Sequence, residues 1–187
     1  MTLSHRLINL PEAPGAADNR ARMIDSPSLP GASRVFELPD LAATEALAAS
    51  LAANAEKRDV IALSGGLGAG KTAFARGFIR ARPGGQEVAE VPSPTFTLVQ
   101  VYDLPGAPVW HFDLYRLARP EDAWELGLEE ALVDAISLIE WPERLGSLLP
   151  ETRLDIELSP GAQSEARRAK VTARGSWVAR FAGLAHG

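Results

Sequence analysis

The eight residues 65–72 constrain the fold of this chain more than any other segment. They read GGLGAGKT and match the pattern G-x-x-x-x-G-K-[ST], in which glycines let successive backbone N–H groups converge on phosphate oxygens. An apolar run at 59–64 precedes the motif, and residues 72–80 after it have helical spacing. A strand, a phosphate-binding loop (P-loop) and a helix are therefore predicted in this order; a chance glycine-rich turn is the alternative.

The residue types of this loop indicate which ligand it binds. The helix after the loop adds free N–H groups and the positive end of its dipole. Lys71 is predicted to reach the β- and γ-phosphates, and the Thr72 hydroxyl to bind a Mg²⁺ ion between them. The predicted ligand is a nucleoside triphosphate, and the residues expected to bind it are Gly65, Gly66, Leu67, Gly68, Ala69, Gly70, Lys71, Thr72 and Ala73.

Composition limits the architecture and the class of protein. The chain has 187 residues, of which 46% are hydrophobic, and this fits one α/β domain. It has no cysteine, which excludes disulfides, cysteine-based zinc sites and thiol chemistry, and its histidines (His5, His111, His186) are too scattered to suggest a metal cluster. No apolar run has the length of a membrane helix, and the start of the chain does not resemble a signal peptide, so we predict a cytoplasmic protein with no membrane partner.

The order of patterns along the chain predicts a flexible extension at residues 1–32, rich in Pro, Gly, Ala and Ser, and a P-loop domain at 33–187. The expected fold is α/β: a P-loop NTPase with a central, mostly parallel sheet flanked by helices, plus antiparallel hairpins. Asp40 and Ser176 are expected to cap helices. The expected strands are 34–38, 59–64, 96–102, 109–112, 135–139, 153–158 and 169–173, and the expected helices are 41–55, 72–80, 120–134 and 176–184.

A P-loop alone binds phosphate, and a hydrolase also needs an acidic group at the end of a neighbouring strand. Glu140 ends the apolar run 136–139, and Asp113 ends the strand pattern 109–112. Both are candidate catalytic acids; a surface carboxylate or a helix cap is the alternative for each. Thr95 lies between the P-loop helix and the next strand, where nucleotide hydrolases carry a mobile segment, although a rigid Pro-containing turn is an equal alternative.

Other polar residues fit a structural role at least as well as a functional one. His111 is more typical of a packed core or surface histidine than of a general base. Tyr115 and Arg116 could pair with a phosphate or could start a helix on the surface. The basic run 167–170 is predicted to be the solvated face of a hairpin, and the formal net charge of −5 argues against strong binding to nucleic acid by this chain alone.

The class of nucleotide enzyme is narrowed by motifs that the chain lacks. It contains no N-K-x-D string, which regulatory GTPases use to bind guanine, and the D-x-x-G match at 103–106 falls in a predicted hairpin turn. The segment 114–134 has only Arg116 and Arg119, fewer arginines than the lid of a small-molecule kinase usually carries. A kinase and a nucleotide-gated adaptor with incidental hydrolysis remain as alternatives to an ATPase.

Four motifs in this order and spacing resemble the bacterial TsaE (YjeE) family, over about residues 34–175. They are GAGKT at 68–72, SPTFTL at 93–98, HFDLYR at 111–116 and LIEWP at 138–142. The resemblance implies a small P-loop ATPase that acts with TsaD and TsaB. This system places threonylcarbamoyl on the adenosine next to the anticodon of tRNA, so contact with tRNA is expected only through the complex.

The resemblance also implies roles for individual residues. Residues 68–72 would hold the phosphates of ATP, Thr72 and Glu140 would bind Mg²⁺, Asp113 would be needed for hydrolysis and Thr95 would belong to the mobile segment. The helix start at 40–44 resembles the region beside the adenine. No arginine is placed by a motif as a transition-state group, so hydrolysis is expected to be weak without partners.

Overall fold

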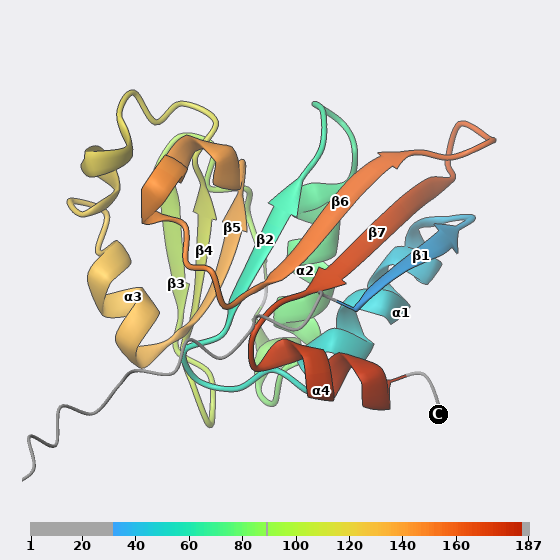
Figure 1. The fold of residues 1–187 in the computed structure, drawn as a ribbon, viewed down its shortest axis with the longest axis horizontal. Coiled ribbons are helices and arrows are strands. Elements are labelled where there is room, and N and C mark those ends of the chain that lie inside the picture. The colour runs from blue at the N-terminus through green and yellow to red at the C-terminus, as the bar shows by residue number, and fades with distance from the viewer. Residues whose placement is uncertain (1–31, 89, 185–187) are drawn as a thin grey trace, which may run out of the picture.

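The computed structural model describes residues 32–88 and 90–184, which form one sheet with helices on both faces (Figure 1). The predicted extension at 1–32 lies outside the described residues, apart from Ala32. The strands are β1 (Ser33–Leu38), β2 (Val60–Ser64), β3 (Val99–Tyr102), β4 (Val109–Asp113), β5 (Ile136–Glu140), β6 (Leu154–Pro160) and β7 (Arg167–Ala173). The helices are α1 (Leu41–Ala52), α2 (Lys71–Ala81), α3 (Leu128–Asp134) and α4 (Trp177–Gly183), with 3₁₀ segments at Gly85–Glu87, Pro120–Ala123 and Pro142–Leu148.

The seven strands follow the order β1-β7-β6-β2-β5-β4-β3. The four central strands, β6, β2, β5 and β4, are parallel, whereas β7 and β3 pair antiparallel with their neighbours. The carboxyl ends of the parallel strands meet at one edge of the sheet, which is where open α/β sheets bind ligands. The predicted α/β class with a mostly parallel sheet is confirmed.

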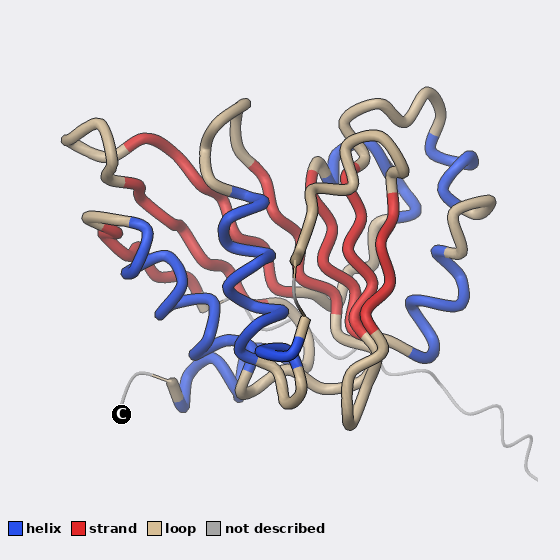
Figure 2. Tube along the Cα trace, turned by 180° about the vertical axis from the view of Figure 1, so that it is seen from behind, coloured by secondary structure: helices blue, strands red, loops and turns tan. Residues whose placement is uncertain are grey.

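Two apolar clusters fill the two faces of the sheet. Helices α1, α2 and α4 pack on one face, through residues such as Leu51, Phe78 and Trp177. Helix α3 and the 3₁₀ segment Pro142–Leu148 pack on the other face, through Leu128 and Leu145. Figure 2 shows α1 and α2 in front of the sheet and α3 beyond it. The P-loop helix is thus held between the sheet and a neighbouring helix.

Burial along the strands follows this layering. β5 is buried at every position and β2 at four of its five positions, as expected for parallel strands covered on both faces. β6 alternates between buried and more exposed residues, because its outer face is open. The central strands therefore give a rigid base to the loops at their carboxyl ends.

The predicted continuous helix at 120–134 is wrong. The segment forms a 3₁₀ turn at Pro120–Ala123 and then α3 from Leu128. Gly127 separates the two at a φ of +83°, and a Cβ at this position would lie 2.7 Å from the Trp110 ring. A close contact with a distant strand therefore breaks a pattern that looks helical in sequence.

The two predicted helix caps have different outcomes. The Asp40 carboxylate accepts a hydrogen bond from the Ala43 N–H at 2.8 Å, so its role as the cap of α1 is confirmed. Ser176 makes no capping hydrogen bond to α4, and its hydroxyl instead accepts one from Arg180 at 3.3 Å. None of the described helices has the length and apolar character needed to cross a membrane.

Candidate functional site

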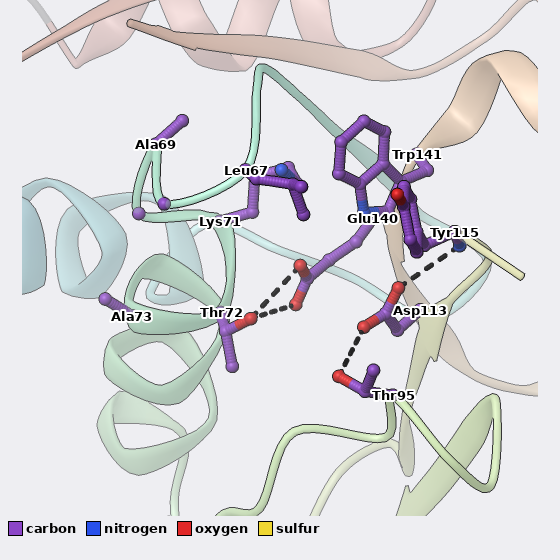
Figure 3. A pocket seen from close by; sticks show the side chains of 12 residues that line it. Leu67, Ala69, Lys71, Thr72, Ala73, Thr95, Asp113, Tyr115, Glu140 and Trp141 are labelled. Atoms are coloured by element: carbon purple, nitrogen blue, oxygen red, sulfur yellow. Dashed lines mark hydrogen bonds between the residues drawn. The ribbon is translucent and has the colours of Figure 1, made fainter. Parts of the chain in front are cut away.

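A cavity of about 260 Å³ lies at the carboxyl edge of the sheet, where β2, β4 and β5 end (Figure 3). It is polar on one side and bordered by two aromatic rings on the other. Its lining residues are Leu67, Gly68, Ala69, Gly70, Lys71, Thr72, Ala73, Thr95, Asp113, Tyr115, Glu140 and Trp141. All the predicted site residues except Gly65 and Gly66 therefore line one cavity.

Gly65 and Gly66 do not line the cavity, but they set the backbone path of the loop. Gly65 has a φ of +133°, and a Cβ there would lie 2.3 Å from the carbonyl oxygen of Leu158 in β6. Glycine is required at this position because the loop crosses the neighbouring strand in close contact. Gly66 begins a tight turn, in which its carbonyl accepts a hydrogen bond from the Ala69 N–H at 3.2 Å.

The Lys71 ammonium group lies inside the curve of the loop. Its Nζ donates hydrogen bonds to the carbonyl oxygens of Gly65 at 2.7 Å and Gly66 at 2.8 Å, and it lies 3.8 Å from the centre of the Trp141 ring. Burial lowers the pKa of Lys71 below its ordinary value, although the nearby carboxylates of Glu140 and Asp113 act in the opposite direction. No acid among the described residues forms an ion pair with this buried cation, so it is suited to receive an anionic ligand.

Glu140, at the end of β5, is held by hydrogen bonds from two other elements. The Thr72 hydroxyl, in the first turn of α2, donates to its carboxylate at 2.9 and 3.1 Å. His111 in β4 has its Nε2 2.9 Å from Glu140 Oε1. Figure 3 shows the Glu140 side chain pointing toward Thr72. The carboxylate is buried, with 2% of its residue surface exposed.

Asp113 is paired with Glu140 in the β4–β5 register, so the two acids end adjacent parallel strands. Its Oδ2 accepts a hydrogen bond from the Thr95 hydroxyl at 2.9 Å, and its Oδ1 accepts one from the Tyr115 N–H at 3.2 Å. The Thr95 hydroxyl also lies 2.6 Å from that of Ser93. The segment that carries Thr95 therefore lines the cavity directly and is also tied to Asp113.

The donor atoms of this cavity fit Mg²⁺ bound together with phosphates. Thr72, Glu140 and Asp113 supply hydroxyl and carboxylate oxygens, which are the ligands that Mg²⁺ prefers. Among residues 32–88 and 90–184, no group of three or more His, Cys, Asp or Glu side chains forms a complete metal cage.

The arrangement as a whole suits a phosphorylated ligand. Backbone N–H groups of the loop and the start of α2, a buried ammonium group and two acids converge on one cavity. A second cavity of about 310 Å³ lies near the expected adenine region at 40–44. Leu41 and Ala73 both line it, and Ala73 also lines the first cavity.

Two contacts of the site were missed by sequence reasoning. His111 was predicted to be a packed core or surface histidine; it is buried, and its partner is Glu140. Its position two residues before Asp113, on the same face of one strand, was the available signal. Arg167 was assigned to a solvated hairpin face, yet its Nη2 lies 3.4 Å from the carbonyl oxygen of Gly68. Arg116 stacks on the Phe96 ring at 4.9 Å.

Comparison with known proteins identifies relatives of this chain. The family model "Threonylcarbamoyl adenosine biosynthesis protein TsaE" matches residues 38–169. The tRNA threonylcarbamoyladenosine biosynthesis protein TsaE of Rickettsia bellii is 43% identical over 115 residues, which are 62% of this chain and 78% of the relative. The TsaE protein of Haemophilus influenzae is 40% identical over 120 residues, which are 64% of this chain and 73% of the relative.

The fold has a counterpart among solved structures. The crystal structure of Bacillus subtilis YdiB superposes with a TM-score of 0.68 at 29% sequence identity, and the match covers 83% of this chain and 95% of that chain. The TsaE protein of Bacillus subtilis is 37% identical over 124 residues, which are 65% of this chain and 75% of the relative. The family resemblance expected from the four sequence motifs is confirmed.

Proposed function

Because this chain belongs to the TsaE family, whose role is in the biosynthesis of tRNA threonylcarbamoyladenosine, we propose that it is a Mg²⁺-dependent ATPase of that pathway. The observation that carries the proposal is the convergence of Lys71, Thr72, Asp113 and Glu140 on one cavity beside a P-loop. These groups match the parts that P-loop hydrolases use. The proposed site of action is the cytoplasm.

The residues of the loop bind and orient the triphosphate. Backbone N–H groups at 68–72 donate to phosphate oxygens, and Lys71 exchanges the carbonyls of Gly65 and Gly66 for the β- and γ-phosphates. Thr72 and Glu140 would hold Mg²⁺, which neutralises charge on the phosphates when it is bound. Ala73 and Leu41 border the neighbouring cavity, which suits the base.

Asp113 acts on the attacking water. Its carboxylate lines the cavity one strand away from Glu140, and Thr95 and the Tyr115 N–H hold it in place. A carboxylate fixed in this way orients a water molecule toward the γ-phosphate and accepts its proton. Thr95 connects the segment 93–98 to this acid, so a movement of the segment changes the geometry of hydrolysis.

Partners are expected to control turnover. Among the described residues that line the cavity, none is an arginine. An arginine supplied by a partner increases the rate of P-loop hydrolases by roughly 10³ to 10⁵. We propose that TsaD and TsaB are these partners and that tRNA contacts the complex and not this chain alone. Hydrolysis by the isolated protein is then slow.

Phosphate release by the isolated chain, and by the chain with TsaD, TsaB or both, tests the proposal. We expect slow turnover alone and strong stimulation by the partners; equal rates in all mixtures contradict it. Asp113→Asn should keep nucleotide binding and lower stimulated turnover by about 10²- to 10⁴-fold, because it removes the general base. A kinase transfers the phosphoryl group instead of releasing it, so ATP consumption that rises with a particular metabolite, and not with TsaD, indicates a kinase.

A second measurement separates the catalyst from a nucleotide-gated adaptor. A pull-down with TsaD and TsaB in ATP and in ADP reports whether the nucleotide state changes assembly. This chain or its Asp113→Asn variant is then added to a reconstituted tRNA-modifying mixture that lacks only its own TsaE. Formation of the modified base with each protein reports whether turnover is needed. Full modification by Asp113→Asn would favour the adaptor.

A further inference from the structure

His111 is a costly residue for a core position. It is completely buried in β4, and its Nδ1 has no hydrogen-bond partner in the described part of the chain. An unpaired buried polar atom destabilises a protein, so packing alone favours an apolar side chain here. The single hydrogen bond that its ring makes to the described residues joins Nε2 to Glu140 Oε1 at 2.9 Å. This bond is the structural reason for a histidine.

The strand register explains why the contact forms. Side chains two residues apart share one face of a strand, so His111 lies on the face of β4 that also carries Asp113. In the parallel pairing, Asp113 is opposite Glu140 and His111 is opposite Leu138. The imidazole is thus one step deeper in the sheet than the two acids and reaches the Glu140 carboxylate from the core side.

Glu140 is therefore held from two independent directions. The Thr72 hydroxyl reaches it from α2, and His111 reaches it from β4. A carboxylate oxygen only accepts, so Nε2 is the donor in the second bond. Groups that hydrogen-bond to a metal ligand fix its orientation, and their loss typically weakens metal affinity or activity by about 10- to 100-fold.

We propose that His111 is a positioning residue, which orients the Glu140 carboxylate toward Thr72 and the cavity through its Nε2–H. The proposal rests on the proposed function, in which Glu140 holds Mg²⁺. His111 is not among the residues that line the cavity, and it acts through Glu140 alone. Its loss changes how well the site uses Mg²⁺ and leaves the phosphate-binding loop intact.

Two variants of the full chain test this role, His111→Gln and His111→Met. The amide N–H of glutamine can replace Nε2–H, whereas methionine has similar bulk and no donor. Calorimetric titration with a non-hydrolysable ATP analogue is repeated over a range of Mg²⁺ concentrations and in EDTA. We expect His111→Met to need about 10- to 100-fold more Mg²⁺ for the same affinity, with little change in EDTA, and His111→Gln to behave as wild type.

The control is a variant that destabilises the core but leaves the hydrogen bond between His111 and Glu140 unchanged. Ile139→Val removes one methylene from the buried core on the other face of β5 and so destabilises the fold. It should lower the melting temperature and leave the Mg²⁺ requirement unchanged. Equal Mg²⁺ requirements in His111→Met and wild type would overturn the proposal, and so would equal defects in His111→Met and His111→Gln.

A readout on the metal-free protein covers the case in which His111→Met does not fold. Long-range ¹H–¹⁵N spectra distinguish the two imidazole tautomers, and the chain has only three histidines. The His111 signals are those missing from His111→Gln. We expect the proton on Nε2, and a shifted Nε2 signal in Glu140→Ala. A proton on Nδ1 overturns the inference while the proposed function stands; a wild-type protein that binds nucleotide without regard to Mg²⁺ overturns both.

Discussion

At the scale of single residues, the Lys71 side chain shows how the loop is prepared for an anion. Its ammonium group is buried against carbonyl oxygens and the Trp141 ring, and no acid forms an ion pair with it among the described residues. We expect Lys71→Met to abolish binding of Mg²⁺-ATP in calorimetry. The nucleotide-free variant should keep its free energy of unfolding to within about 1 kcal/mol, because a charge that is costly to bury is removed together with its hydrogen bonds. Unfolding of this variant at room temperature would contradict the prediction.

The lowered pKa of Lys71 also predicts the sign of a pH effect. Burial holds the folded-state pKa below 10.5, so the unfolded chain binds more protons between the folded-state value and 10.5. The free energy of unfolding contributed by Lys71 therefore rises with pH through this window and is lowest below it. The difference between wild type and Lys71→Met in urea unfolding isolates this contribution. The free energy of unfolding of the wild type should rise relative to that of Lys71→Met from neutral pH toward pH 10.

At the scale of elements, the P-loop depends on one glycine for steric reasons. A Cβ on Gly65 would lie 2.3 Å from the Leu158 carbonyl, at a φ of +133° that other residues rarely adopt. We expect Gly65→Ala to lower the free energy of unfolding by at least about 3 kcal/mol, because strain and overpacking add. Gly66→Ala is the matched control, since a Cβ there has nothing within 4 Å, and it should change stability by less than about 1 kcal/mol. Urea denaturation compares the two variants. Equal midpoints would contradict the prediction and would mean that β6 shifts to make room for the new Cβ.

The last helix is tied to the central strand by an ion pair. Arg180 in α4 makes two hydrogen bonds of 2.6 Å to the carboxylate of Asp59, which precedes β2 and is 7% exposed. We expect Arg180→Ala to cost about 3 kcal/mol, because it leaves a buried carboxylate without its partner. Arg174→Ala, which breaks a more exposed pair with Asp155, should cost less than about 1 kcal/mol. Thermal melts of the two variants give the comparison, and similar losses would mean that the Asp59 pair is solvated.

The elements that sequence reasoning predicted well are those whose pattern is set locally. The apolar runs of β2 and β5 and the Asp40 cap of α1 are confirmed because burial and capping depend on neighbouring residues. The break before α3 was missed because it depends on Gly127 meeting Trp110 from another strand. The Ser176 cap was wrong because Arg180 binds its hydroxyl.

The candidate site likewise contains residues that a local pattern predicts and contacts that depend on strand pairing. Glu140 and Asp113 were predicted as its acids because each follows an apolar strand, and parallel strands end at one edge of a sheet. The bond between His111 and Glu140 depends on the pairing of β4 with β5, and no spacing in the sequence fixes that register. Arg167 reaches Gly68 only because β7 begins at the same edge.

At the scale of the whole molecule, the negative net charge of the chain suggests that partner proteins make the contact with tRNA. The chain has a formal net charge of −5, and several arginines of the hairpin face and its surroundings are paired with acids. Arg168 pairs with Glu37, and Arg153 and Arg174 both bind Asp155. Paired cations release fewer counterions when they meet phosphate, so they add little to binding. This supports the assignment of tRNA contact to the complex.

The cavity joins segments that are far apart in the chain, so ligand binding should stabilise the whole fold. Residues 67–72 follow β2, and Asp113 and Glu140 end β4 and β5, so the lining of the cavity depends on three central strands. A ligand that binds only the folded state at one hundred times its dissociation constant adds about 2.7 kcal/mol. For a chain of this size we expect Mg²⁺-ATP to raise the melting temperature by about 5 to 10 °C. The shift should be smaller in EDTA and absent in Lys71→Met, and an equal shift in that variant would mean that the nucleotide binds elsewhere.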